Sequence, residues 1–272
     1  MIRSDILNDT PLRKKTEERG CFLVYEYEHD VSVNEYSAMM AYFASQMNVR
    51  KRQLVARLDK SAVILQAGAM QMMMGAVEST TDLKGAGDFF KKVVGSTVTG
   101  ETAIKPRFSG TGAVVLEPTY KYVILEDMSE WDGKLIIEDG MFLACEDTIE
   151  LSVAARNTVS SALLGGEGLF NTRLTGKGIV ALESRVPREE LITVDLKEDV
   201  LKIDGSMAVA WTDGLKFTVE RTTKTLIGSA VSKEGLVNVY RGTGRVLVAP
   251  VDNMMWDPSV LLPTKAPTKG KG

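Results

Sequence analysis

The sequence predicts a mainly β protein that is built from repeated antiparallel units, with a few short helices. Two observations predict this class. A phrase of paired glycines followed by an apolar run occurs three times, and other segments alternate apolar and polar residues as half-buried strands do. The paired glycines are Gly110 and Gly112, Gly176 and Gly178, and Gly242 and Gly244. Because 176 − 110 and 242 − 176 both equal 66, the repeat has a period of 66 residues.

Each glycine pair predicts a tight turn or bulge that opens a buried strand. Glycine adopts positive φ without a steric penalty, and apolar residues follow each pair. We therefore expect positive φ at these six structural-turn glycines. We also expect burial of the apolar residues that follow them and of two methionines: Met72, Met74, Val114, Leu116, Val180, Leu182, Val246 and Val248.

The repeat extends beyond the glycines. Residues 141–144 match residues 207–210, and Asp147 corresponds to Asp213. The unit before residue 100 is more diverged, and the last unit is cut short after residue 250. Several β units that each bury one face poorly are expected to pack as a closed assembly.

A helix is predicted over about residues 34–47. Residues 32–35 have the spacing of a capping box, and large apolar side chains then recur at helical spacing: Tyr36, Met39, Met40, Phe43 and Met47. Such a stripe is usually a core face, and a ligand groove is the alternative. Further short helices are expected at residues 88–94 and 154–164.

Two other stretches have competing interpretations. The methionine-rich residues 62–75 are expected to form buried strands in the core or at a subunit interface, with a pore lining or an adaptable binding surface as alternatives. Arg50, Lys51 and Arg52 are expected in a solvated loop rather than a phosphate site, because a nucleic-acid surface needs a broad basic footprint.

Composition divides the chain into three parts. Residues 1–19 are polar and charged and are expected to form an exposed N-terminal arm. Residues 20–254 are expected to form a single β domain with the repeats, and residues 255–272 a flexible tail of Pro, Thr and Lys.

Charge and cysteine content limit the possible partners and compartment. The 272 residues contain 33 Lys plus Arg and 36 Asp plus Glu, so the net charge of −3 gives no reason to expect DNA as a partner. Cys21 and Cys145 have no metal-site spacing, so neither a disulfide framework nor a zinc site is expected. No signal peptide and no transmembrane segment are predicted, and the expected location is cytoplasmic.

The residues of known catalytic constellations are missing. His29 is the only histidine, which excludes Ser-His-Asp, Cys-His and multi-histidine metal sites. Carboxylate pairs occur at residues 126–127, 138–139 and 146–147, where solvated turns are the common case. We expect no catalytic, cofactor-binding or metal-binding residue and no cofactor; an enzyme that uses carboxylates alone remains the alternative.

Residues 166–178, followed by Ile179-Val180-Ala181-Leu182, closely resemble the signature of the altered-inheritance-of-mitochondria (mitochondrial biogenesis) family. Residues 66–72 and 141–145 contribute to the resemblance, which spans about residues 20–250 and points to a bacterial member of unknown function. It implies a fold like that of the tryptophan RNA-binding attenuation protein, a double-stranded β-helix or β-sandwich in oligomeric assemblies. The mitochondrial members are linked to inner-membrane organisation, and the resemblance transfers no catalytic residue.

These observations predict a non-enzymatic structural or interaction protein, a homo-oligomeric β scaffold. A trimer is favoured because three similar units suit a ring, and an unidentified protein partner is compatible with this role. The alternatives are a ring that binds a small ligand or RNA, by analogy of fold, and the carboxylate-only enzyme.

Overall fold

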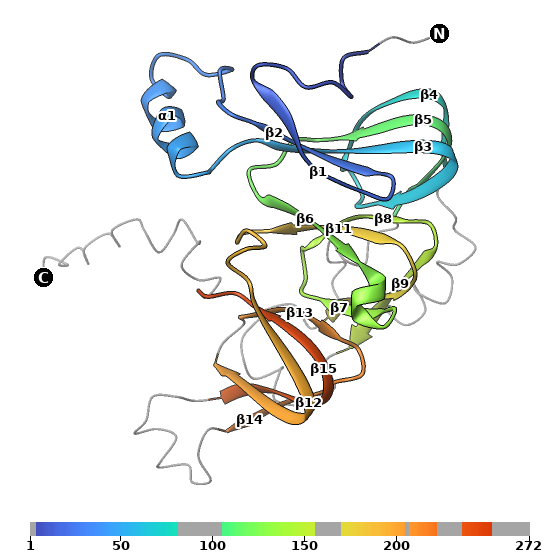
Figure 1. The fold of residues 1–272 in the computed structure, drawn as a ribbon, viewed down its shortest axis with the longest axis vertical. Helices are drawn as coiled ribbons and strands as arrows, with labels where there is room; N and C mark the ends of the chain where they lie inside the picture. Colours follow the sequence, from blue (N-terminus) through green and yellow to red (C-terminus); the bar gives the residue numbers. More distant parts are fainter. Residues whose placement is uncertain (1–3, 81–104, 156–169, 205–206, 222–235, 252–272) are drawn as a thin grey trace, which may run out of the picture.

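The structure is a computed structural model that describes residues 4–80, 105–155, 170–204, 207–221 and 236–251 (Figure 1). The described residues form fifteen β-strands, one α-helix and one 3-10 turn. The prediction of a mainly β protein with few helices is confirmed.

The elements are β1 (Arg13–Arg19), β2 (Phe22–Tyr27), α1 (Ala38–Gln46), β3 (Arg52–Leu65), β4 (Met70–Thr80), β5 (Arg107–Leu116), β6 (Tyr122–Asp127), η2 (Met128–Trp131), β7 (Lys134–Ile137), β8 (Phe142–Glu146), β9 (Ile149–Ala155), β10 (Phe170–Gly176), β11 (Ile179–Ser184), β12 (Ile192–Asp204), β13 (Ala208–Thr212), β14 (Lys216–Arg221) and β15 (Leu236–Val248).

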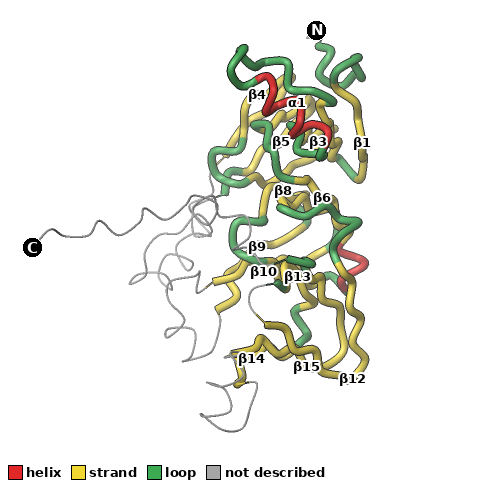
Figure 2. Tube along the Cα trace, turned by 90° about the vertical axis from the view of Figure 1, so that its left-hand side faces the viewer, coloured by secondary structure: helices red, strands yellow, loops and turns green. Residues whose placement is uncertain are grey.

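The strands form two antiparallel sheets. The first has the order β1-β2-β3-β8-β11-β6, and β5 lies between β3 and β4. The second has the order β12-β15-β13-β7-β10-β9, and β14 also pairs with β15. The molecule is elongated: β1–β5 and α1 lie at one end, and β12, β14 and β15 lie at the other (Figure 1). Figure 2 shows the same stacking from the side.

Long bent strands connect the parts of the first sheet. The first half of β3 pairs with β2, its last residues pair with β8, and β5 follows it along both halves. A bulge interrupts the β3–β5 pairing at Lys60, whose φ is +49°. Because a bulge increases the local twist and bends a strand, β3 takes part in two differently oriented parts of the sheet.

Two large cores lie on the faces of these strands. One contains Phe22, Leu54, Val63, Phe108, Val114 and Leu116, from β2, β3 and β5. The other contains Trp131, Leu135, Ile149, Leu174, Val180 and Leu247, from both sheets. The apolar runs of all three phrases thus contribute to buried cores.

The six paired glycines have φ values from +123° to +156°, as the sequence led us to expect. Their position differs from the predicted turns. Gly110 and Gly112 lie inside β5, and Gly242 and Gly244 lie inside β15, whereas Gly176 and Gly178 separate β10 from β11. A Cβ atom on Gly112 would lie 1.9 Å from the carbonyl oxygen of Met74, so the glycine allows close approach within a continuing ladder rather than a chain reversal.

Strand registers in the last two copies have the same 66-residue offset as the glycines. Arg173 pairs with Ser152 between β10 and β9, and Val239 pairs with Thr218 between β15 and β14. Ala181 pairs with Ala144, and Leu247 pairs with Ala210. The Arg–Asp ion pairs 107–147 and 173–213 have the same offset.

The prediction that these eight residues are mostly buried, in the core or between subunits, is confirmed within the chain for five of them. Val114, Leu116, Val180, Leu182 and Val246 are buried. Val248 and Met74 are only partly buried, and Met72 is exposed. The methionines differ because β4 pairs only with β5 among the described strands, and a strand at a sheet edge covers less of its surface.

Four further predictions concern the ends and the short helices. Residues 13–19 of the expected N-terminal arm form β1, whose side chains are mostly exposed but whose backbone pairs with β2. The expected helix at 88–94 and the tail at 255–272 lie outside the described residues. Of the expected helix at 154–164, residues 154 and 155 end strand β9 and the others lie outside the described residues.

Replacing Gly176 with Ala is expected to destabilise the protein by about 1–3 kcal/mol, through backbone strain and contact with a carbonyl oxygen. A Cβ atom there would lie 2.3 Å from the carbonyl oxygen of Thr148, at a φ of +138°. Gly140→Ala is the matched control, since Gly140 also has positive φ but no atom within 4 Å of the added Cβ. Urea unfolding measures the stability of both variants. Equal losses of stability would contradict the argument that the carbonyl oxygen of Thr148 lies too close for a Cβ atom.

Candidate functional site

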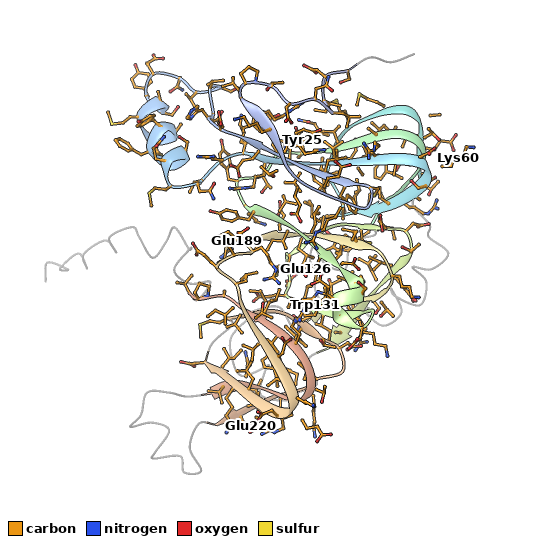
Figure 3. The ribbon with its side chains drawn as sticks, in the orientation of Figure 1. Tyr25, Lys60, Glu126, Trp131, Glu189 and Glu220 are labelled. Carbon is orange, nitrogen blue, oxygen red and sulfur yellow. The ribbon has the colours of Figure 1, made fainter. Side chains whose placement is uncertain are left out.

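The helix α1 exposes the apolar side chains that we expected to face the core. Its large apolar side chains are exposed, with Met39 at 72%, Met40 at 77%, Phe43 at 60% and the flanking Met47 at 76%. The residues turned towards the body of the protein are small: Ala41, Ala44 and Ser45. Figure 3 shows α1 at the edge of the molecule, with side chains that extend from it on the side away from the sheets. The expectation of a core face is therefore wrong, because periodicity shows that one stripe is apolar and not which side the protein covers.

Polar contacts hold α1 in this orientation. Ser45 is 2% exposed, and its carbonyl oxygen accepts a hydrogen bond of 3.0 Å from Arg50 Nε. Its hydroxyl lies 3.4 Å from His29 Nδ1, which is where the structure places the only histidine. The predicted capping box is also wrong: the helix begins after Ser37, which makes no side-chain cap, and Asn34 Oδ1 accepts from the backbone of Tyr36 and Ser37 instead.

A second apolar surface lies on strand β4. Met70, Met72 and Met73 are 37%, 38% and 46% exposed, and only Met74 packs against a buried cluster. The methionine-rich residues 62–75 thus contain the end of β3 and the start of β4, so the prediction of strands is confirmed. Val63 and Leu65 are in the core, whereas Met70, Met72 and Met73 are exposed in this chain. An exposed apolar edge strand is a surface on which another chain can pair.

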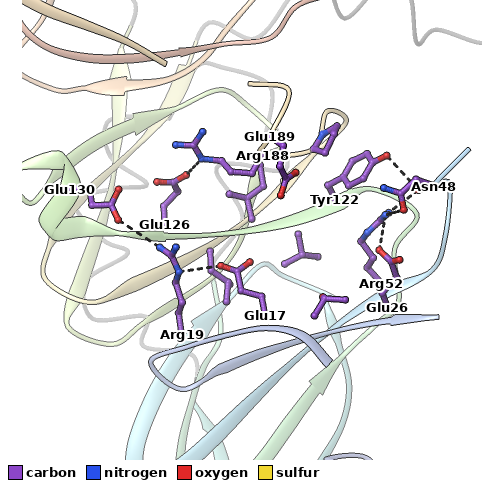
Figure 4. A pocket seen from close by; sticks show the side chains of 15 residues that line it. Glu17, Arg19, Glu26, Asn48, Arg52, Tyr122, Glu126, Glu130, Arg188 and Glu189 are labelled. Atoms are coloured by element: carbon purple, nitrogen blue, oxygen red, sulfur yellow. Dashed lines mark hydrogen bonds and ion pairs between the residues drawn. The ribbon is translucent and has the colours of Figure 1, made fainter. Parts of the chain in front are cut away.

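The third feature is a charged groove of about 400 Å³ between β1, β2, β6 and residues 187–189 (Figure 4). Five glutamates and three arginines line it: Glu17, Glu26, Glu126, Glu130, Glu189, Arg19, Arg52 and Arg188. All three arginines are engaged with carboxylates. Arg19 and Glu17 lie on the same strand, whereas the Arg52–Glu26 and Arg188–Glu126 pairs join segments that are 26 and 62 positions apart.

Glu126 is the buried centre of this groove. It is 3% exposed; its Oε1 accepts a hydrogen bond of 2.7 Å from Arg188 Nε, and its Oε2 accepts one of 3.0 Å from Trp131 Nε1. A buried carboxylate is tolerated when its oxygens are paired in this way. Glu126 and Trp131 lie near the middle of the molecule (Figure 3).

Arg52 closes the other end of the groove. It is 4% exposed, pairs with Glu26 at 2.9 Å and lies 4.0 Å from the centre of the Tyr122 ring. Its neighbours Arg50 and Lys51 pair with Glu26 and Asp30. The prediction of a solvated basic loop is wrong for these residues, because acidic side chains 20 or more positions away fold onto them.

The comparisons with known proteins identify the family. A family model described as mitochondrial biogenesis AIM24 matches residues 45–251, which is more than half of the chain. The chain belongs to this family. The X-ray crystal structure of protein SPYM3_0169 from Streptococcus pyogenes is similar with a TM-score of 0.55, at 20% identity, over 79% of this chain and 94% of that chain. At this identity the likeness shows the fold alone. No curated protein matches the chain.

The family match begins at residue 45 and so excludes nearly all of α1, whereas it includes β4 and most of the groove. Only the last two residues of the apolar helix, 45 and 46, therefore lie within the matched region. The matched region contains all six paired glycines, which lie in β5, at the β10–β11 connection and in β15.

Two of the acidic pairs, at residues 126–127 and 146–147, act as structural hydrogen-bond acceptors. Asp127 caps η2 by accepting from the backbone of Ser129, and Asp147 accepts two hydrogen bonds, of 2.7 and 2.8 Å, from Arg107. Glu146 accepts backbone hydrogen bonds from Cys21 and Ile179. The expectation of solvated turns is wrong for the buried Glu126, and sequence gave no signal for its partners Arg188 and Trp131.

The cysteines lack the character of nucleophiles. Burial raises the pKa of the Cys21 thiol to about 12 and raises that of the Cys145 thiol as well. Within the described ranges, no group of His, Cys, Asp and Glu side chains is arranged to hold a metal ion. Nor does this part of the chain contain a helix that is long and apolar enough to cross a membrane.

Removing Arg188 is expected to destabilise the protein, because Glu126 then stays buried with only Trp131 as a partner. We expect Arg188→Met to cost about 1.5–3 kcal/mol, the usual range for a hydrogen bond to a charged group. Lys121→Met is the control; it breaks the more exposed Lys121–Glu183 pair of 2.6 Å and should cost under about 1 kcal/mol. Chemical denaturation measures the free energy of unfolding of both variants. If Arg188→Met lowers it no more than the control does, Glu126 does not need Arg188 as a partner.

Glu17 predicts a pH effect on stability. Burial in the groove raises the pKa of its carboxyl, and Arg19 opposes this shift. A proton therefore binds more tightly in the folded state, so this contribution to stability is present at low pH and is lost as pH rises through the raised pKa. Glu17→Gln should raise the melting temperature at pH 7 relative to the unmodified chain, and the difference should shrink towards pH 4. A variant less stable at pH 7 would show that the Arg19 pair dominates.

Proposed function

We propose that the protein is a non-enzymatic interaction scaffold that assembles with copies of itself through the edge of β4. The observation that carries this proposal is the exposed Met70, Met72 and Met73 on a strand that pairs on one side only within the described residues. An open strand edge offers unpaired backbone groups to another chain, and exposed methionines adapt to irregular partners.

Family membership and fold are compatible with this role but add no activity. The three similar units favour a ring, for which a trimer is the simplest closed form. A scaffold needs rigid rather than reactive side chains, and the buried Glu126 and the paired Asp147 serve the fold. An RNA-binding ring receives less support, because Arg50, Arg52, Arg107 and Arg241 are engaged in ion pairs.

The test is the molar mass in solution. We expect size-exclusion chromatography with light scattering to give a multiple of 29.7 kDa at micromolar concentration. The double variant Met72→Lys and Met73→Lys should lower that mass, since lysine on an edge strand opposes edge pairing. Ile192→Lys, an exposed residue of β12, is the control and should leave the mass unchanged.

Two outcomes would contradict the proposal. A monodisperse monomer of the unmodified chain would exclude self-assembly under these conditions. An oligomer whose mass is the same in the double variant would show that β4 is not the contact. Far-UV circular dichroism of each variant checks that the strands are retained.

A further inference from the structure

We propose that α1 is a dimerisation seam, which packs against α1 of a second copy of the chain across a two-fold axis. The inference rests on the proposed self-assembly and adds a surface separate from β4. Its basis is the inverted helix: small residues face the protein, and large apolar residues face outwards. An isolated helix of nine residues is marginal in water, so packing has to stabilise it.

The outward stripe has the spacing of a helix–helix seam. Four apolar residues follow one another at intervals of four, three and four residues: Tyr36 just before α1, Met40 and Phe43 within it, and Met47 just after it. They are 60–89% exposed. Alternating intervals of three and four place side chains on one side of a helix, where they can interdigitate with a facing helix. Met39 and Tyr42 widen the stripe, and Tyr42 lies edge-on to Phe43 at 5.4 Å.

The absence of charge favours a second copy as the occupant. No residue from 36 to 47 is charged, so two copies of this surface can face each other without repulsion. A helix that binds a membrane surface normally carries basic residues on its polar face. Here the nearest basic side chains, Arg50 and Lys51, are bound to Glu26 and Asp30. A lipid surface is therefore less well supported than the same helix of another chain.

The area that this contact would bury is compatible with a specific but reversible dimer. If each of the six exposed side chains buries on the order of 100 Å², the pair buries roughly 1,200 Å² in total, the lower limit for a specific interface. Because Ser45 and Arg50 hold the helix in place, little of this contact depends on ordering a flexible segment. We expect pairing that depends on protein concentration.

The first experiment removes the seam. A two-fold contact through α1 joins two identical assemblies that are formed by other surfaces of the molecule. In the double variant Met40→Ser and Phe43→Ser, light scattering should therefore give half the molar mass of the unmodified chain. Ile192→Ser is the matched control for loss of an exposed apolar residue. An unchanged mass would overturn the seam. The β4 variants, Met72→Lys and Met73→Lys, test the scaffold proposal independently of this result.

The second experiment tests the symmetry. In a chain with Cys21→Ser, in which the remaining Cys145 is fully buried, Phe43→Cys should form covalent dimers with a short bismaleimide, and Ile192→Cys should not. If the Ser double variant has half the molar mass but Phe43→Cys gives no cross-link, α1 does not pair with α1 of a second copy and docks on another surface instead. Flotation of the unmodified chain, but not of the Ser double variant, with phosphatidylcholine vesicles would overturn the proposal in favour of a lipid surface.

Discussion

The carboxylate of Glu146 holds together three segments on which the first sheet depends. Its Oε1 accepts a hydrogen bond of 3.1 Å from the backbone of Cys21, in the β1–β2 connection, and its Oε2 accepts one of 3.0 Å from Ile179, at the start of β11. Hydrogen bonds to a charged acceptor are stronger than those between neutral groups. Glycines leave the room for them, because a Cβ on Gly20 or Gly178 would lie 2.4 or 2.5 Å from these oxygens.

The backbone N–H group 66 residues after that of Ile179, which belongs to Arg245, has a different acceptor. Thr212, 66 residues after Glu146, accepts a hydrogen bond of 3.0 Å through its hydroxyl from the backbone of Arg245. A short neutral side chain replaces a long charged one, and only one hydrogen bond remains. The backbone N–H groups of Ile179 and Arg245 thus both have a side-chain acceptor, although the accepting residue differs.

Local requirements made part of the fold predictable. Gly110, Gly176 and Gly242 have φ values that residues with a side chain rarely adopt, and a carbonyl oxygen also lies close to the first two. The glycine pairs and the apolar runs after them could therefore be found from the sequence. The orientation of α1 could not, because apolar spacing is the same whether a stripe faces the core or the solvent. Glu126 and Arg188 are 62 positions apart, and nothing local indicates that they meet.

The hairpin beneath α1 has a consequence for how this surface can vary. The backbone of Tyr27 donates a hydrogen bond of 2.9 Å to the carbonyl oxygen of Lys51, so the β2–β3 ladder closes before the chain departs for the helix and resumes when it returns. The 23 residues from 28 to 50 therefore form an excursion from a completed hairpin. Selection, or an engineer, can shorten, extend or exchange this excursion without altering the ladder that supports it, so that one framework can carry different exposed surfaces.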